Sequence, residues 1–183
     1  MKLKHTTIEI ATKEDFDRVI EIFNEAKSFI KSTGSPQWQT GNPNSNSFAS
    51  DINSKSLYKV SIDGNIEAIF FISDNEHTYD IIYEGHWGFT TFIVLHRVAI
   101  SNKMRGKGLF KDILEFSYNY ATSKNIDGIR IDTHEKNEAM KKSLLINGFK
   151  YCGIIHLNNK DDYIRLAYEK DLRNGRYCKT KNY

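Results

Sequence analysis

The sequence predicts one mixed α/β domain, in which a central mixed sheet of six to seven strands is flanked by about four helices. Three observations lead to this fold class. Hydrophobic patterns typical of strands and of helices alternate along the 183 residues. A β-branched and aliphatic run at residues 91–100 leads through a glycine-containing loop directly into a helical pattern. The two clearest strand patterns lie on either side of an Asp-Gly turn at residues 63–64, as in a hairpin.

The first half of the chain is predicted to hold a short strand, two helices and this hairpin. Alternating residues at 6–12 indicate the strand. A capping-box-like pattern then begins an amphipathic helix, whose apolar positions recur at helical spacing over residues 16–30. Residues 48–54 predict a second, shorter helix. Residues 57–62 and 66–72 predict the two strands of the hairpin.

In the second half, a strand, a helix and a strand form one unit, whose strands should lie parallel with a right-handed crossover. A further helix, closed by Asn147 and Gly148, and two more strands follow. These elements cover residues 91–100, 109–124, 128–133, 137–146, 149–157 and 163–172. The polar and aromatic stretch at 73–90 fits neither pattern, and we expect it to cross the face of the next strand.

Composition restricts the class of protein. The net charge of +3, from 26 basic and 23 acidic residues, is small for a chain of this length and does not predict binding to nucleic acid. No apolar run is long enough for a membrane span, and no signal-peptide pattern follows the first methionine. We therefore expect a soluble, cytoplasmic protein that does not bind membranes.

Cysteine and histidine usage adds two expectations. The only cysteines, Cys152 and Cys178, suggest reduced thiols and not a disulfide framework. The six histidines are scattered without a short-spaced ligand pair, so no metal site is predicted. One domain is expected over residues 1–172, followed by a polar, basic and flexible tail at 173–183.

The loop after residue 100 predicts a phosphate site. It holds Gly106 and Gly108 among the cations Lys103, Arg105 and Lys107, and it opens into a helix whose first amide N–H groups have no internal partners. Glycines let the backbone approach a ligand closely, and the helix dipole favours an anion. The nucleoside-triphosphate loop needs Lys-Ser or Lys-Thr after its last glycine, and the dinucleotide fingerprint needs three glycines, so neither motif fits.

The same loop resembles the central motif of the GNAT family of N-acetyltransferases, which reads Arg or Gln, two residues, Gly, one residue, then Gly or Ala. Arg105 and Gly108 match this motif, whereas Phe110 stands where a small residue is usual. The order of predicted elements resembles the GNAT fold over nearly the whole chain, and Gly148-Phe149 resembles the pair that enters the sixth strand of that fold.

Three further segments resemble a branch of small-molecule acetyltransferases that are uncharacterised. They are Gln37-Trp38-Gln39, His96-Arg97-Val98-Ala99 and Ile131-Asp132-Thr133-His134-Glu135. The resemblance implies acetyl-CoA as cosubstrate and direct transfer of its acetyl group, in a ternary complex, to a primary amine of a small molecule or peptide. A homodimer is also compatible with it.

The resemblance further implies which residues hold acetyl-CoA. Backbone groups at the bulged end of the central strand polarise the thioester carbonyl and bind the pantetheine arm, while the glycine loop binds the pyrophosphate. The residues at the matching positions are Val98, Ala99, Ile100, Arg105, Gly106, Lys107, Gly108, Leu109, Phe110, Thr133, Asn137, Met140 and Lys141.

A general base is needed to take the proton of the acceptor amine. His96 is the leading candidate, because many GNAT relatives have a Glu at this position and an unperturbed imidazole titrates at about pH 6.5. It could instead be a hydrogen-bonded core histidine. His134 and Glu135, after the fifth strand, form a second candidate pair, with loop capping as their alternative role. Glu84 and His86 are the third candidates.

The general acid that many relatives use is missing. Counting back from Gly148-Phe149, the position of the usual Tyr holds Leu144. Tyr151 or water would then protonate the thiolate, or the thiolate leaves unassisted, since a thiol pKa of about 8.5 makes it a fair leaving group. Cys152 lies in a predicted strand without an adjacent His, so we expect a small core residue there and not an acyl carrier.

The acceptor site is predicted to be lined by the aromatic residues Trp38, Tyr83, Trp87 and Phe89. Glu84 and Glu135 are expected to hold the ammonium group of the acceptor. One alternative remains within the family: a catalytically degenerate member that binds CoA as a sensor or interaction module, as the departures at Phe110 and Leu144 suggest. Nucleic-acid binding through the basic tail is a third, weaker alternative.

Overall fold

The computed structural model describes residues 5–157 and 163–173 and contains seven strands and four α-helices in that part of the chain. The strands are β1 (Thr6–Ile10), β2 (Leu57–Ile62), β3 (Asn65–Ser73), β4 (Phe92–Ile100), β5 (Gly128–Thr133), β6 (Lys150–His156) and β7 (Ile164–Asp171). The helices are α1 (Phe16–Ser32), α2 (Ser45–Asn53), α3 (Leu109–Ser123) and α4 (Glu138–Ile146), with short 3-10 turns η1 (Lys13–Asp15) and η2 (His77–Tyr79).

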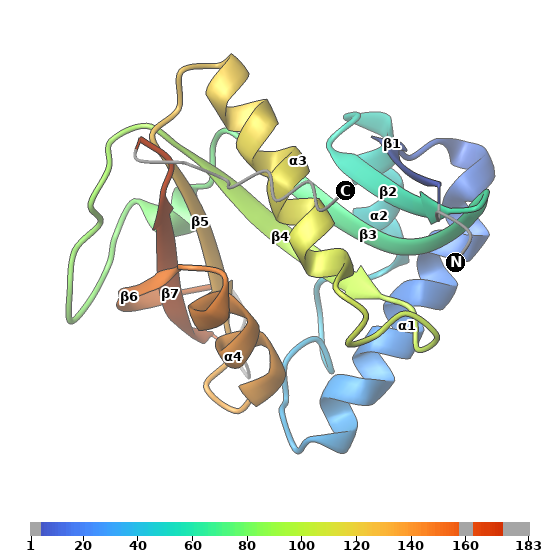
Figure 1. Ribbon diagram of the computed structural model, residues 1–183. Helices are drawn as coiled ribbons and strands as arrows, with labels where there is room; N and C mark the ends of the chain where they lie inside the picture. Colours follow the sequence, from blue (N-terminus) through green and yellow to red (C-terminus); the bar gives the residue numbers. More distant parts are fainter. Residues whose placement is uncertain (1–4, 158–162, 174–183) are drawn as a thin grey trace.

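All seven strands belong to one sheet in the order β1-β2-β3-β4-β5-β7-β6 (Figure 1). Every neighbouring pair is antiparallel except β4 and β5, which are parallel and are joined by α3. The fold class predicted from the sequence is confirmed, and so is the parallel pair.

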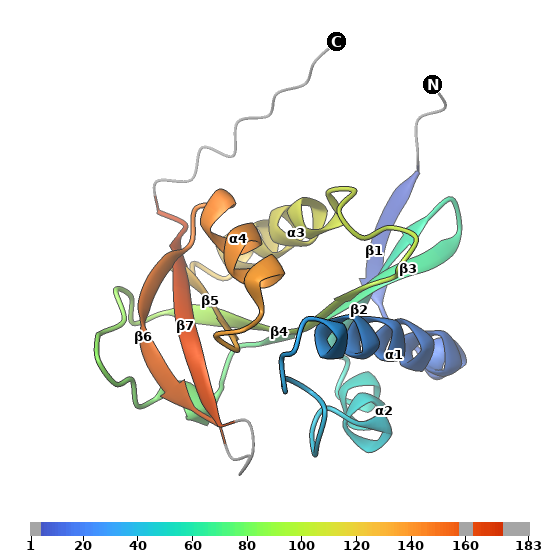
Figure 2. The same cartoon turned by 90° about the horizontal axis from the view of Figure 1, so that it is seen from below.

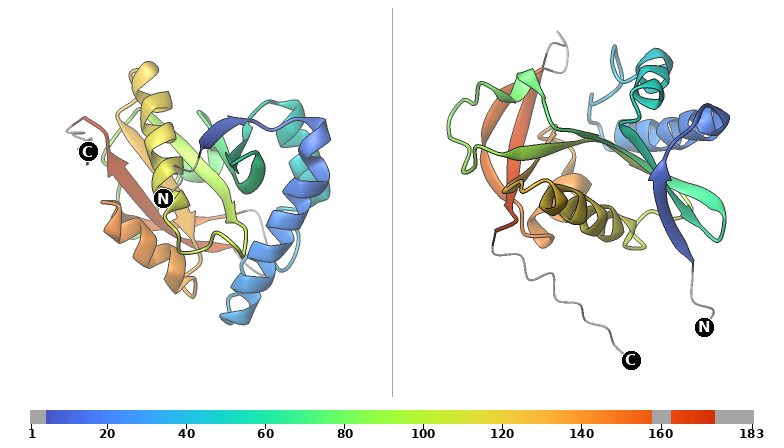
Figure 3. Two further views of the ribbon diagram at one scale, coloured as in Figure 1. Left: turned by 45° about the vertical axis from the view of Figure 1, so that its right-hand side comes forward. Right: turned by 90° about the horizontal axis from the view of Figure 1, so that it is seen from above.

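Helices cover both faces of the sheet. Helices α1 and α2 lie on one face, and α3 and α4 lie on the other (Figures 2 and 3). Val19 and Ile22 of α1 pack with Phe48 of α2 in one apolar cluster, whereas Ile113 and Leu114 of α3 belong to a second cluster across the sheet. All five side chains are fully buried, and each contributes roughly 1.5–3 kcal/mol to folding.

Capping residues that can be recognised in the sequence determine where the helices begin and end. Thr12 and Asp15 form a capping box ahead of α1, and the Asn44 side chain accepts hydrogen bonds from two backbone N–H groups at the start of α2, which begins three residues earlier than predicted. Gly148 has φ +81° and ends α4 in the left-handed conformation.

The stretch at 73–90 crosses the end of the sheet and then continues to the outer strand β6. Tyr79 is fully buried against Val94 of β4, as expected for a segment that crosses the face of this strand. Beyond it, Trp87 stacks on Tyr79 with ring centres 5.5 Å apart, and Tyr83 pairs with Ile154 in a β-bridge. The second part of the stretch is therefore an edge covering for β6.

No helix in residues 5–157 and 163–173 is long and apolar enough to cross a membrane. The predicted flexible tail lies outside the described residues, apart from Arg173 at its start. Cys178 and residues 158–162, which connect the last two predicted strands, also lie outside them.

A buried ion pair attaches the stretch at 73–90 to the sheet. Arg130 of β5 donates to Glu169 of β7 at 2.9 Å, and both side chains are about 5% exposed or less. Glu169 also accepts a hydrogen bond from the N–H of Gly88, and Arg130 donates to the carbonyl oxygen of Phe89. The guanidinium lies 4.1 Å from the ring centre of Trp87.

We expect Glu169→Ala to lower the free energy of unfolding by about 3–5 kcal/mol, because the substitution leaves Arg130 charged, buried and without its carboxylate. Urea unfolding followed by circular dichroism measures this change. Glu9→Ala, at an exposed position of β1, is the control and should stay within about 0.5 kcal/mol of the parent. If the two variants were equally stable, the Arg130–Glu169 ion pair would not be the attachment of the stretch at 73–90 to the sheet.

Candidate active site

Strands β4 and β5 part from each other after a short paired region. They are in register over three residue pairs, from Phe92–Gly128 to Val94–Arg130. Beyond Val94, β4 continues to Ile100 along β3, while β5 continues along β7. A gap therefore opens between two strands of one sheet, and backbone groups on both of its edges are left outside any ladder.

A β-bulge lies on β4 beside this gap. The pairing with β3 runs from Ala99–Ile69 to His96–Phe71, so Arg97 and Val98 together face a single residue of β3. Arg97 has φ +54°, in the left-handed region that non-glycine residues seldom adopt. The GNAT resemblance implied a bulge near Val98 or Ala99, and the structure has it at Arg97 and Val98.

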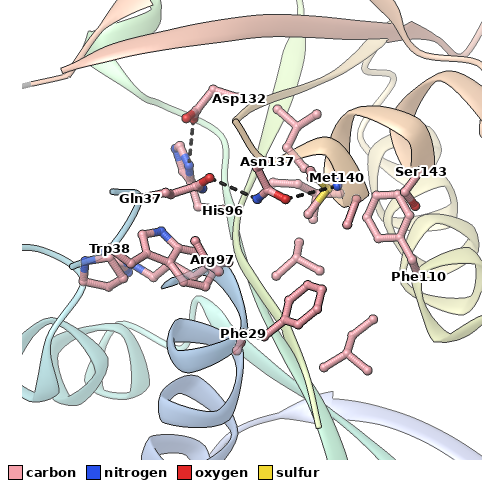
Figure 4. A pocket seen from close by; sticks show the side chains of 18 of the residues that line it. Phe29, Gln37, Trp38, His96, Arg97, Phe110, Asp132, Asn137, Met140 and Ser143 are labelled. Carbon is pink, nitrogen blue, oxygen red and sulfur yellow. Dashed lines mark hydrogen bonds and ion pairs between the residues drawn. The ribbon is translucent and has the colours of Figure 1, made fainter. Parts of the chain in front are cut away.

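A cavity of about 770 Å³ extends along the gap, from the glycine loop to the opposite face of the sheet (Figure 4). The loop end is lined by Arg105, Gly106, Gly108, Phe110, Met140 and Ser143. The strands contribute Leu95, Val98, Ile100 and Ile131 to the middle. The far end is lined by Trp38, Glu76, His96, Arg97, Asp132 and Arg165.

The glycine loop has the backbone that an anion cradle needs. Gly106 and Gly108 have φ +74° and +92°, which only glycine adopts without strain, and Gly108 is the N-cap of α3. The amide N–H groups of Leu109 and Phe110 follow directly and have no partner within the helix, whereas that of Lys111 donates to the Gly108 carbonyl oxygen at 2.9 Å. This end of the cavity can bind a phosphate group at the positive end of the helix dipole.

The cations of the loop differ in their orientation. The Arg105 guanidinium stacks 3.8 Å from the ring centre of Phe29, lines the cavity and donates to Asn102. Burial lowers the pKa of Arg105 from its ordinary value, yet the group stays charged at neutral pH. Lys103 does not line the cavity: its Nζ donates to the buried Glu67 at 3.0 Å. Lys103 is thus directed to Glu67 and not into the cavity.

Gln37 connects the loop after α1 to the start of α4. Its Oε1 accepts hydrogen bonds from Nδ2 of Asn137 at 3.0 Å, and from the Thr133 hydroxyl and the His134 backbone N–H at 3.2 Å each. The Oδ1 of Asn137 in turn accepts from the N–H of Met140 and caps α4. Gln37 is buried and orients Asn137 at the edge of the cavity (Figure 4).

His96 lies between two carboxylates at the far end of the cavity. Its Nε2 is 3.2 Å from Oε2 of Glu76, and its Nδ1 is 3.5 Å from Oδ1 of Asp132. The Tyr79 hydroxyl donates to the same Oδ1 at 2.6 Å, and Nε of Arg165 is 3.2 Å from Oδ2. We call these five residues the His96 cluster.

The electrostatics of the His96 cluster follow from these contacts. The hydrogen bond with His96 lowers the pKa of the Glu76 carboxyl to about 2, although burial opposes the shift. Burial raises the pKa of Tyr79 well above its ordinary value, and Asp132 adds to this effect, so Tyr79 remains a neutral donor. With His96 neutral, two carboxylates and one guanidinium leave the cluster with one net negative charge.

Most of the other predicted catalytic and acceptor residues lie away from the cavity. Tyr83 stacks on His156 at 4.2 Å on the outer side of β6, and Trp87 donates from its indole to the carbonyl oxygen of Tyr79. Glu84 is exposed in the same edge covering, and Tyr151 is half-exposed on β6. Tyr83, Glu84, Trp87 and Tyr151 are not part of the cavity wall, to which the stretch at 73–90 contributes Glu76 and Thr78 instead.

His134 and Glu135 do not line the cavity either. Nδ1 of His134 accepts a hydrogen bond from the N–H of Lys136, as in loop capping, and Glu135 is exposed. Trp38 and His96 are the predicted catalytic or acceptor residues that the cavity wall does contain. Glu76, Asp132 and Arg165 were missed, since no local motif links positions this far apart.

Some of the predicted cofactor residues line the cavity and others do not. Nine line the cavity: Val98, Ile100, Arg105, Gly106, Gly108, Leu109, Phe110, Asn137 and Met140. Four do not. Ala99 packs with α1 and α2, Lys107 is exposed, the Thr133 hydroxyl donates to Gln37, and Lys141 pairs with Glu138 at 2.6 Å.

The structure is similar to the crystal structure of a GNAT-family acetyltransferase from Streptococcus agalactiae 2603. The TM-score is 0.80, and the sequences are 34% identical over 91% of this chain and 95% of that chain. The chain belongs to the GNAT family of acetyltransferases. It is therefore an acyltransferase enzyme, and its sheet with four helices has the GNAT fold.

Two further GNAT structures share the fold at lower identity. An acetyltransferase from Listeria monocytogenes 4b F2365 has a TM-score of 0.70 and 18% identity over 92% of this chain and 99% of that chain. The PaiA N-acetyltransferase from Thermoplasma acidophilum, in complex with coenzyme A, has a TM-score of 0.69 and 14% identity over 91% and 99%. No protein-family model matches the sequence, and no curated protein matches it.

Two departures of this GNAT sequence from the family motifs have structural consequences. Phe110 is buried, belongs to the core beneath α3 and forms part of the cavity wall near Ser143 (Figure 4). Leu144, at the position where many GNAT relatives have a Tyr as general acid, is fully buried in the same core. The helix that would supply a general acid thus presents none from this position.

We expect Gln37→Met to lower the free energy of unfolding by about 1–3 kcal/mol, because Asn137, Thr133 and the His134 N–H lose their common acceptor. Gln37→Glu keeps an acceptor oxygen and should recover most of the loss. Urea unfolding of both variants tests this. If the Met variant were as stable as the parent, Gln37 would not be the connection between the two segments.

Proposed function

We propose that this protein is an N-acetyltransferase that transfers the acetyl group of acetyl-CoA to a primary amine of a small molecule or peptide, by direct attack in a ternary complex. One observation carries the proposal: a single cavity joins the glycine loop, through the gap between β4 and β5, to the His96 cluster. A cosubstrate and an acceptor could therefore meet inside the sheet.

The residues along the cavity fit coenzyme A. Arg105 and the first amide N–H groups of α3 would bind the pyrophosphate, and Gly106 and Gly108 leave this backbone without side chains. Val98 and Ile100, at the open edge of β4, would bind the amide groups of the pantetheine arm, with Asn137 opposite. A complex of coenzyme A with a GNAT protein of the same fold supports this placement.

When bound, acetyl-CoA supplies a thioester whose acyl group passes to the amine nitrogen while the thiol is released. The backbone N–H of Val98 lies in the bulge, outside the register of β3, and would donate to the carbonyl oxygen as negative charge develops there. Without an acid at Leu144, water would protonate the departing thiolate, which is a fair leaving group.

His96 would act as the general base. Once the acceptor's ammonium group takes the place of Nε2–H as the donor to Glu76, an imidazole with its Nδ1–H directed to Asp132 would present the lone pair of Nε2 to that ammonium and take its proton. The ammonium would replace Nε2 as the hydrogen-bond partner of Glu76, 3.2 Å away in the present arrangement. Tyr79 and Arg165 fix Asp132, and Asp132 fixes the imidazole.

A catalytically degenerate member that binds CoA without turnover is the second candidate. Phe110 and Leu144 favour it, since both replace residues that other GNAT enzymes use. A thiol-release assay with acetyl-CoA and pooled primary amines separates the two functions. A protein that CoA protects against heat unfolding, yet that releases no thiol with any amine, would be the degenerate binder.

His96→Gln should lower kcat by about 10²- to 10⁴-fold, because a glutamine cannot take the proton of the amine. CoA binding, followed by calorimetry, should be unchanged. His156→Gln, at an exposed position of β6, is the matched control and should keep the activity of the parent. Full activity in the His96 variant would exclude this histidine as the base.

Arg105→Gln should weaken the binding of CoA by about 10-fold or more, since one charge-assisted hydrogen bond to phosphate is lost. Lys103→Gln is the control within the same loop and should change the Kd by less than about 2-fold, because Lys103 faces Glu67. Equal losses in both variants, measured by calorimetry, would contradict the placement of the pyrophosphate.

A further inference from the structure

The far end of the cavity presents opposite charges on two sides. We define it as the acceptor chamber, lined by Trp38, Glu76, His96, Arg97, Asp132 and Arg165. Figure 4 shows Trp38, His96, Arg97 and Asp132 together on one side of the cavity, away from Phe110, Met140 and Ser143. The His96 cluster is net negative when His96 is neutral, whereas Arg97 brings a positive charge to the same chamber.

Arg97 lines the chamber, whereas its counterion does not. Asp51 of α2 pairs with Nη1 of Arg97 and is 7% exposed, but it is not part of the cavity wall. Among the described residues, Asp51 is the one hydrogen-bond partner of Arg97, although a guanidinium has five N–H donors. The remaining donors are available to a second anion, and Asp51 holds the group in place.

The bulge on β4 brings this side chain into the chamber. Arg97 follows His96 directly, and its left-handed conformation at φ +54° interrupts the alternation of side chains between the two faces of the strand. The guanidinium carbon of Arg97 lies 4.9 Å from the ring centre of Phe71, and the His96 ring lies 6.2 Å from the same centre. The guanidinium carbon of Arg97 and the His96 ring centre are therefore at most about 11 Å apart.

We propose that the acceptor is a small amino acid-like molecule, whose amine is held by Glu76 and His96 and whose carboxylate is bound by Arg97. This inference rests on the proposed acetyl transfer and names the substrate class. A molecule that satisfies both groups must be short, because both flank the ring of Phe71. A diamine or polyamine would instead place a second ammonium against the Arg97 guanidinium, at a cost in affinity.

The test uses the full chain with saturating acetyl-CoA and three series of acceptors of matched length. They are ω-amino carboxylates from glycine to 5-aminopentanoate, n-alkylamines and α,ω-diamines. The parent, Arg97→Gln and Arg97→Lys are compared, with Arg173→Gln as the control at an exposed position far along the chain. Since Arg97→Gln leaves Asp51 unpaired, the double variant Arg97→Gln with Asp51→Asn keeps the test valid if the single variant unfolds.

The parent should prefer an amino carboxylate over the n-alkylamine of equal length by about 10-fold or more in kcat/KM. Arg97→Gln should raise KM for the amino carboxylate by a similar factor, leave its kcat within about 3-fold, and change KM for the alkylamine by less than about 2-fold. Arg97→Lys should retain part of the preference. An equal effect of Arg97→Gln on both series, or diamines as the best acceptors, would overturn the proposal.

Binding provides a readout that does not depend on turnover. Calorimetry of CoA-saturated protein with 4-aminobutanoate and with n-butylamine should give tighter binding of the carboxylate, lost in the Arg97 variant. If no amine of any class caused thiol release, the proposed acetyl transfer would be refuted. If 4-aminobutanoate and n-butylamine bound equally tightly, the proposed acceptor class would be refuted. The two failures are therefore distinguishable.

Discussion

The early parting of β4 and β5 is the constraint on which the rest of the site depends. Two strands that remained paired to their ends would satisfy their backbone groups and close the sheet. Here the pairing stops at Val94, and β3 and β7 hold the two strands apart. A cavity consequently passes between strands, with open peptide groups on its edges and a helix N-terminus at one mouth. An extended ligand with its own amides complements such a gap.

The far side of the sheet is built from charges that folding alone would not select. Asp132 and Arg165 are almost completely out of water, and such pairs repay their desolvation poorly unless the geometry is good. Together with His96 and Glu76 they form a polar cluster beside an apolar core. The desolvation of these buried charges is explained by preorganisation of the site. Tyr79 and Arg165 hold Asp132 in place, and Asp132 orients the imidazole of His96.

Local signals in the chain predicted local features well. The capping residues at 12–15, the Asp-Gly turn and the strand–loop–helix at 91–124 each depend on neighbours in sequence, and each has the predicted form. The path of the long loop at 73–90 could be predicted only in its first part. Tyr83, Glu84 and Trp87 lie in the edge covering of β6, because an aromatic-rich loop has no periodicity that fixes its path.

The sequence by itself determined the elements and the glycine loop, because these follow from backbone preferences and short spacings, and its motifs carried the family resemblance, which implied the bulge in the central strand. Only the tertiary structure decided which side chains share the cavity. Glu76, His96, Asp132 and Arg165 come from four separate segments, and Lys103, within the loop itself, pairs with Glu67. Contacts between side chains this far apart in sequence depend on the order of strands in the sheet and on where β4 and β5 separate. No short stretch of sequence encodes either.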